Sequence, residues 1–236
     1  MWTIHGKSVP GTIDELLRPD RTAHVVIDLQ NDCCHPEGSC AQAGADVSRY
    51  PQTIARVVQL VEASRRIGVL QVFVRMLTLP NGASDSPSWI RLRQRLAIQY
   101  AGAEQPATPV EFCMQGTWGA ELVDDLKSVA QESDPVVYKH RSSAFFGTNL
   151  DMLLRSNGIS TVMFTGCTTE GCLESTVRDA GFLDYFPVVI EDGVNSDVVE
   201  LHNASLRVMR AYRADVITAD EALAAFGRSM PQEASV

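Results

Sequence analysis

The chain has 236 residues, 45% of them hydrophobic, and a formal net charge of −9 at pH 7. This length allows a sizeable core, and we expect a single α/β domain over residues 1–236. The acidic balance and the lack of a basic run argue against nucleic acid or an anionic membrane surface as the partner. These properties favour a small-molecule substrate.

Targeting and cysteine patterns give further expectations. The N-terminus reads MWTIHGKSV, without a signal-peptide pattern, and no stretch approaches the roughly 20 apolar residues of a membrane span. Six cysteines show neither a disulfide framework nor the paired spacing of a zinc site: Cys33, Cys34, Cys40, Cys113, Cys167 and Cys172. We therefore expect a cytoplasmic protein with reduced thiols, in which Cys33, Cys34 and Cys40 are loop residues.

Residues 1–22 are interpreted as an N-terminal surface arm with one short amphipathic piece, Ile13–Leu17. From Ala23, the run AHVVIDLQND predicts a buried first strand that ends at Asp28. A carboxylate at this position either caps a turn or pairs with a surface cation, or it acts as a base at the carboxyl end of a parallel strand. The polar residues just beyond it favour the functional interpretation.

The next part of the chain predicts a helix over Gln52–Ile67 and a second strand over Val69–Arg75. Residues 76–109 are irregular around a helical piece, Trp89–Gln99, and an insertion of this length is typical of a lid or a subunit contact. Its arginines either touch substrate or form a solvated helix face: Arg91, Arg93 and Arg95.

A helix is predicted from Trp118 over WGAELVDDLKSVA, followed by a third strand, Pro135–Tyr138. Lys139 comes directly after this strand, where a lysine is usually a solvent-exposed charge. A further helix is predicted from residue 148 or 149 to Asn157.

The stretch TVMFTGCTTEGC contains a strand over Thr161–Thr165, which stops at Gly166, and the start of a helix over Glu170–Gly181. Cys172 lies near that helix start, where backbone N–H groups and the helix dipole stabilise a thiolate. The alternative is a small buried hydrophobic residue, since free cysteine is often buried.

The last part predicts a fifth strand, Phe186–Ile190, that ends in two acidic residues, then a helix over Asp197–Tyr212 that begins with a capping box. A sixth strand, Asp215–Thr218, precedes a short helix whose capping box is Thr218 and Glu221. This alternation predicts an α/β fold with a six-stranded, mostly parallel, doubly wound (Rossmann-like) sheet and helices on both faces.

Three residues with uncommon chemistry end three apolar runs: Asp28, Lys139 and Cys172. Their surroundings read VVIDLQND, KHRSSAFFGTNLDMLLRSNGI and FTGCTTEGCLESTVRDAGFLDYF. Through these motifs the chain resembles the isochorismatase-like cysteine hydrolase superfamily from Ala23 to Phe226. Among its branches, the chain is most similar to the ureidoacrylate and biuret type of amidohydrolase.

The resemblance implies that Cys172 is the nucleophile, Asp28 the general base and Lys139 the cation that lowers the pKa of the thiol. Backbone N–H groups of Thr168 and Cys172 would form the oxyanion hole, beside a cis peptide bond between Cys167 and Thr168. The implied reaction cleaves a C–N bond of a small ureido or amide substrate through a thioester and releases ammonia or a carbamate. The alternatives are an isochorismatase-type ether hydrolase and a catalytically inactive binding or assembly member.

Departures from the family pattern refine these expectations. The metal-binding Asp-x-His pair of nicotinamidases is replaced by RMLTL at residues 75–79, so we expect neither a metal ion nor a cofactor. Glu170 stands where relatives have Asn or Asp, and it either favours the helix N-terminus or recognises a cationic or amino-rich substrate group. Candidate substrate-binding residues, each alternatively a core or interface residue, are Asn31, Trp89, Trp118, Phe145 and Glu170. We also expect a homo-oligomer, either a dimer or a tetramer.

Overall fold

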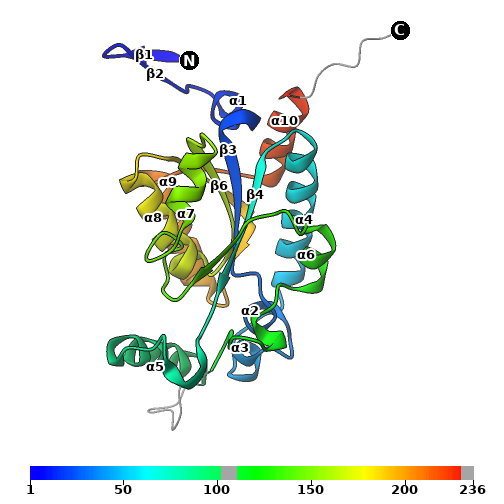
Figure 1. The fold of residues 1–236 in the computed structure, drawn as a ribbon, viewed down its shortest axis with the longest axis vertical. Helices are drawn as coiled ribbons and strands as arrows, with labels where there is room; N and C mark the ends of the chain where they lie inside the picture. The colour runs from blue at the N-terminus through cyan, green and yellow to red at the C-terminus, as the bar shows by residue number, and fades with distance from the viewer. Residues whose placement is uncertain (102–110, 230–236) are drawn as a thin grey trace.

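The computed structural model describes residues 1–101 and 111–229. Its centre is a six-stranded sheet in the order β5-β4-β3-β6-β7-β8, in which every neighbouring pair is parallel (Figure 1). This confirms the predicted fold class. The strands are β3 (Thr22–Ile27), β4 (Leu70–Met76), β5 (Val136–Lys139), β6 (Thr161–Cys167), β7 (Phe186–Asn195) and β8 (Asp215–Ile217).

Helices cover both faces of this sheet, because each of its faces is apolar (Figure 1). One face packs against α7 (Leu150–Ser156), α8 (Glu174–Phe182) and α9 (Val199–Tyr212). The other packs against α4 (Tyr50–Arg66), α6 (Asp124–Val129) and α10 (Ala219–Ser229). The central strands β3 and β6 are buried along their whole length, so their carboxyl ends are held rigidly.

The two ends of the molecule differ in structure. The predicted N-terminal arm contains a hairpin that the sequence analysis did not predict, β1 (Trp2–Ile4) and β2 (Lys7–Val9), followed by α1 (Ile13–Leu16). At the opposite end, near the carboxyl ends of the strands, lie α2 (Asn31–Cys34), α3 (Ser39–Gln42) and α5 (Pro87–Ala101) (Figure 1). The last residues of the predicted insertion, 102–109, lie outside the described residues.

Several predicted elements differ from the structure. Cys33 and Cys40 lie in the short helices α2 and α3 rather than in a loop. The helix predicted from Trp118 is a 3-10 turn, Trp118–Ala120, separated from α6. The helix predicted over Glu170–Gly181 is divided into a π-helical turn, η4 (Thr169–Leu173), and α8.

Strand β7 continues to Asn195, because its pairing with β6 shifts register and then resumes. The two acids predicted at its carboxyl end therefore lie within the strand, where Glu191 pairs with Arg210 and Asp192 pairs with Arg56. The N-cap residue of α9 is Val198, which makes no side-chain cap hydrogen bond, rather than the predicted Asp197. The capping box of Thr218 and Glu221 is confirmed by reciprocal hydrogen bonds of 2.8 and 3.2 Å.

Gly166 does not end β6 but allows it to pass close to β3. Its φ is +120°, and a Cβ atom there would lie 2.0 Å from the carbonyl oxygen of Ile27. We expect Gly166→Ala to lower the free energy of unfolding by about 3 kcal/mol, measured by urea titration. The control is Gly181→Ala in α8, where the new methyl group meets no neighbour and should be neutral or stabilising by about 0.5–1 kcal/mol. Equal effects of the two substitutions would contradict this explanation.

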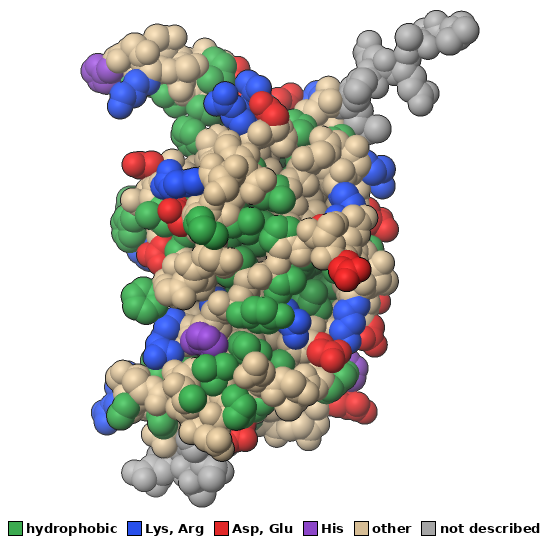
Figure 2. All heavy atoms as spheres, viewed as in Figure 1, with side chains coloured by type: hydrophobic (Ala, Val, Ile, Leu, Met, Phe, Trp, Pro, Cys, Tyr) green, Lys and Arg blue, Asp and Glu red, His purple; other side chains and the backbone are tan. Residues whose placement is uncertain are grey.

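No helix among the described residues is long and apolar enough to span a bilayer. On the face that Figure 2 shows, hydrophobic side chains are interspersed with charged side chains of both signs. Large apolar side chains are exposed on the edge strand β5 and on α7 and α8, namely Val136, Tyr138, Met152 and Phe182. The expected homo-oligomer stays a prediction, and so does the lid or interface role of residues 76–109.

Candidate active site

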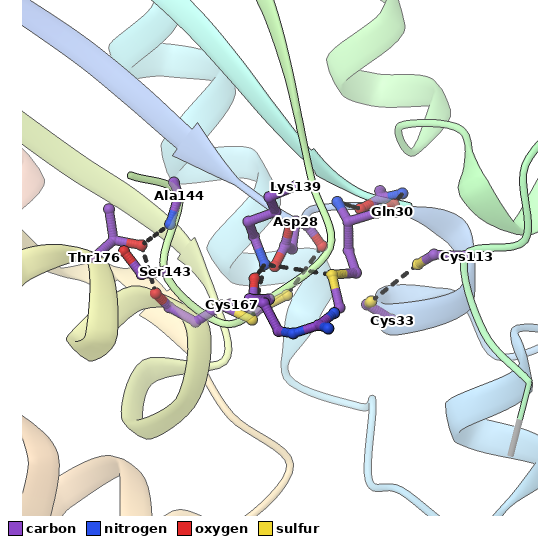
Figure 3. A network of polar contacts seen from close by, with 12 residues as sticks. Asp28, Gln30, Cys33, Cys113, Lys139, Ser143, Ala144, Cys167 and Thr176 are labelled. Atoms are coloured by element: carbon purple, nitrogen blue, oxygen red, sulfur yellow. Dashed lines mark hydrogen bonds and ion pairs between the residues drawn. The ribbon is translucent and has the colours of Figure 1, made fainter. Parts of the chain in front are cut away.

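Asp28 and Lys139 meet at the carboxyl ends of β3 and β5, the two strands on either side of β4. Asp28 follows β3, and its backbone N–H donates to the carbonyl of Val74 at 3.0 Å. Lys139 is the last residue of β5 and is completely buried, so it is not the solvent-exposed charge that a lysine after a strand usually is. Its Nζ atom lies 2.7 Å from Oδ2 of Asp28, which is 4% exposed (Figure 3).

Cys172 completes the cluster from the π-helical turn η4. The Nζ atom of Lys139 donates to its Sγ atom at 3.1 Å and to the backbone carbonyl of Arg141 at 3.2 Å. The structure thus brings together the three side chains that the sequence analysis selected, from positions far apart in the chain. π-Helical turns are rare, and they are frequently found at functional sites.

Hydrogen bonds fix the turn that carries Cys172. The hydroxyl of Thr176 donates to the carbonyl of Cys172 at 2.7 Å and accepts from the N–H of Ala144 at 2.9 Å. The segment after β5 is therefore joined through Thr176 to the start of α8 (Figure 3). The peptide bond between Cys167 and Thr168 is cis, as the family resemblance implies.

The protonation state of the cluster differs from the expected one. Burial raises the pKa of the Cys172 thiol to about 12, the Lys139 ammonium opposes this shift, and the Asp28 carboxylate adds to it. Burial alone would lower the pKa of Lys139, but the charges of Asp28 and Cys172 outweigh it and raise that pKa. Lys139 thus lowers the pKa of the thiol as expected, but burial outweighs its effect and the net shift is upward. A buried ammonium, carboxylate and neutral thiol have no net charge, whereas loss of the thiol proton would leave an uncompensated buried anion.

This raised pKa predicts the pH dependence of Cys172 alkylation in the free protein. Because only the thiolate reacts, the rate with iodoacetamide should rise about tenfold per pH unit between pH 7 and 10, without a plateau. The rate is followed by peptide mass spectrometry, with fragmentation of the peptide that holds both Cys167 and Cys172 to assign the label to one of them. A plateau below pH 8 would mean that the resting sulfur is already an anion.

A cavity of about 320 Å³ opens onto this cluster. Of the predicted substrate-binding residues, Trp89 from α5 and Glu170 from η4 line it, together with Thr168 and Cys172 of the predicted oxyanion hole. Burial raises the pKa of Glu170, although a hydrogen bond from Ser196 opposes the shift. The described lining is otherwise largely apolar and comes from several elements, including Tyr50, Met76, Leu92, Phe112 and Leu201.

The other three predicted substrate-binding residues are not among the described residues that line this cavity, and their contact with substrate stays a prediction. Asn31 is buried and donates its side-chain N–H to the backbone carbonyl of Trp118 at 2.9 Å, so it joins two loops. The ring of Trp118 is 43% exposed and contacts His35 edge-on. Phe145 stacks on Tyr185, with ring centroids 5.8 Å apart, and packs against the core.

The sequence analysis missed part of the cavity wall. Cys33 and Cys40 line it, although they were interpreted as loop residues without a role. Arg93 lines it as well and is 5% exposed, whereas a solvated face was one of two open alternatives for it. The spacing of Trp89 and Arg93 was a usable signal, since residues four apart lie on the same face of a helix.

In the described ranges, 1–101 and 111–229, no group of three or more His, Cys, Asp and Glu side chains is arranged to hold a metal ion. The contacts of Lys139 with Asp28 and Cys172 bring a thiol, a carboxylate and an ammonium together. Such a set can form a nucleophile by moving a proton from sulfur to oxygen without changing its net charge.

Comparison with known families identifies the chain. A model of the isochorismatase domain matches residues 22–221. The chain belongs to the isochorismatase family. An isochorismatase family protein from Desulfovibrio vulgaris subsp. vulgaris str. Hildenborough is 29% identical, with a TM-score of 0.69 over 86% of this chain and 98% of the other.

Two more solved structures of similar proteins come from differently named enzymes. N-carbamoylsarcosine amidase from Thermoplasma acidophilum is 28% identical, with a TM-score of 0.63 over 85% of this chain and 97% of the other. Nicotinamidase from Bacillus subtilis is 23% identical, with a TM-score of 0.66 over 84% of this chain and 99% of the other. At that identity the nicotinamidase supports the isochorismatase fold alone.

Proposed function

We propose that the protein is a cysteine-dependent amidohydrolase that cleaves a C–N bond of a small amide or ureide through a thioester intermediate. The observation that carries this proposal is the simultaneous contact of the Lys139 ammonium with the Asp28 carboxylate and the Cys172 sulfur, at 2.7 and 3.1 Å. A carboxylate and an ammonium buried beside a thiol provide a base, a counter-charge and a nucleophile.

In the first half of the reaction, Sγ of Cys172 attacks the substrate carbonyl carbon while its proton passes to Asp28. The Oδ1 atom of Asp28 is buried and has no hydrogen-bond partner among the described residues, so it is the oxygen free to accept that proton. The oxyanion would accept hydrogen bonds from the backbone N–H groups of Thr168 and Cys172. When the C–N bond breaks, Asp28 returns the proton to the leaving nitrogen.

In the second half, water attacks the thioester carbon and Asp28 takes its proton. The C–S bond then breaks, and that proton returns to the sulfur of Cys172. For a primary ureide, ammonia leaves in the first half and a carbamate in the second. Throughout the cycle, Lys139 stabilises whichever of the two acidic groups is ionised.

The branch of the family is part of the proposal. The motifs around Lys139 and Cys172 are most similar to those of ureidoacrylate and biuret amidohydrolases. The 28% identity to N-carbamoylsarcosine amidase supports the same broad reaction, because that enzyme is named for an N-carbamoyl substrate. A C–N bond next to a carbonyl is therefore the favoured target, ahead of the ether bond of isochorismate-type substrates.

Ammonia release tests this function. The purified protein is incubated with a panel of primary ureides and amides, and with an enolpyruvyl ether as the alternative substrate. We expect equimolar ammonia and carbonyl product from at least one ureide or amide. Pyruvate from the ether without ammonia from any panel member would support an ether hydrolase instead, and no turnover of either class would support an inactive member.

A further inference from the structure

Glu170 presents an unused acceptor beside the nucleophile. It lies two residues before Cys172 on η4 and lines the same cavity. Its Oε1 atom accepts a hydrogen bond from the hydroxyl of Ser196 at 2.9 Å, which fixes the carboxyl group. Its Oε2 atom is buried and has no hydrogen-bond partner among the described residues. A buried acceptor without a partner is unfavourable, so a ligand donor at this atom would be favoured.

Arg93 presents unused donors in the same cavity. Arg91 and Arg95 on the same helix are exposed, but Arg93 is 5% exposed and lies over the ring of Phe112, 5.7 Å from its centroid. Its Nη2 atom donates to Asp85, and its Nε and Nη1 atoms have no acceptor among the described residues. One guanidinium nitrogen therefore anchors the side chain, while two buried donors remain unmatched.

The charges around the cavity leave no surplus cation for an anionic ligand. Arg93 is the one cationic side chain in the described lining, and it already faces the Asp85 carboxylate. Lys139, behind the cavity, already faces Asp28. A carboxylate-bearing substrate would therefore add an anion near Asp85 and Glu170 with no cation to match it, which is unfavourable in a poorly solvated cavity.

We propose that Glu170 and Arg93 are specificity-determining residues that select a ureide or amide without an anionic group. Glu170 accepts a hydrogen bond from a substrate N–H group beside the scissile carbonyl group. Arg93 donates a hydrogen bond to a carbonyl oxygen at the other end of the substrate. The apolar walls between them exclude water from the remaining surface of the substrate. This inference rests on the proposed function, because it concerns the substrate of the same site.

A matched pair of ligands tests the charge selection. N-carbamoylglycinamide and N-carbamoylglycine have the same shape but end in a carboxamide and a carboxylate. Their binding is measured by calorimetry on the Cys172→Ala protein, which binds without turnover. We expect the carboxamide to bind at least about tenfold more tightly than the carboxylate, a difference of about 1.4 kcal/mol. Equal or tighter binding of the carboxylate, or no binding of either compound, would overturn the proposal.

Variants of the two residues test their separate roles. Glu170→Gln in the Cys172→Ala protein keeps an acceptor for Ser196 but turns an N–H₂ group toward the substrate. The affinity for the carboxamide should therefore fall about tenfold, and the ratio of carboxamide to carboxylate affinity should become smaller. Arg93→Lys keeps the charge but removes the guanidinium donors, and it should weaken carboxamide binding by a similar factor. Arg95→Lys, an exposed neighbour, should change nothing.

The outcomes separate this inference from the proposed function. Unchanged affinity in Glu170→Gln and Arg93→Lys, with thermal stability like that of the parent, would overturn the roles of the two residues. If the Cys172→Ala protein binds the carboxamide selectively but the wild type releases no ammonia from any ureide or amide, the proposed function fails and the selectivity inference stands.

Discussion

Replacing Cys172 by alanine should abolish hydrolysis while leaving the fold intact. The substitution removes one sulfur atom from a half-buried position, so no large cavity forms in the core. The expected fall in kcat/KM is at least about 10⁴-fold, because removing the nucleophile removes the covalent route altogether. Ammonia release from the best substrate of the panel measures the effect, and thermal unfolding checks the fold.

The matched control is Cys113→Ala. Cys113 is buried and contacts Cys33, with the two sulfurs 3.8 Å apart, but it does not line the cavity. The control variant should therefore keep most of its activity. Comparable activity of Cys172→Ala and the wild type would exclude a thioester mechanism.

Replacing Lys139 by methionine should affect both stability and activity. The substitution leaves the buried carboxylate of Asp28 without its counter-charge, because it removes the ammonium whose Nζ atom lies 2.7 Å from Oδ2 of Asp28. Breaking a buried ion pair in this way costs about 3–5 kcal/mol of unfolding free energy. Urea titration at pH 7 measures this loss, and hydrolysis should be lost as well.

A second substitution identifies the cause of the instability. In the double variant Asp28→Asn with Lys139→Met, no unpaired charge is buried, so part of the lost stability should return although activity stays absent. Lys127→Met serves as a surface control, since Lys127 is partly exposed in α6 and should change stability by about 0.5 kcal/mol or less. A double variant less stable than Lys139→Met would show that charge pairing does not explain the effect.

The catalytic cluster could be predicted because its signals are local. Asp28, Lys139 and Cys172 each follow a short apolar run, and the carboxyl ends of parallel strands meet at one edge of a sheet. Strand and helix alternation indicates a parallel sheet and so brings these positions to one edge, but local sequence left alternatives for each residue, and the family resemblance joined them as one site. The same reasoning predicted the six strands, although β7 runs past its predicted end because a register shift lets its pairing resume.

The cavity wall could not be predicted in the same way. The partner of Asn31 is the backbone carbonyl of Trp118, which lies 87 residues away in the chain. Local sequence does not distinguish that contact from a ligand contact. Among the three arginines of α5, only the tertiary packing of the helix decides that Arg93 is the buried one. The thiol pKa also depends on burial, which the motif around Cys172 does not encode.

The mass of the protein quenched during turnover tests the central claim most directly. Wild-type protein is mixed with an excess of its best substrate, and the reaction is quenched in acid within milliseconds. The protein is then digested for mass spectrometry. We predict that the peptide containing Cys172 gains the mass of the acyl or carbamoyl group, and that no other cysteine peptide does. Turnover without any such adduct, under conditions in which acid preserves thioesters, would contradict the mechanism.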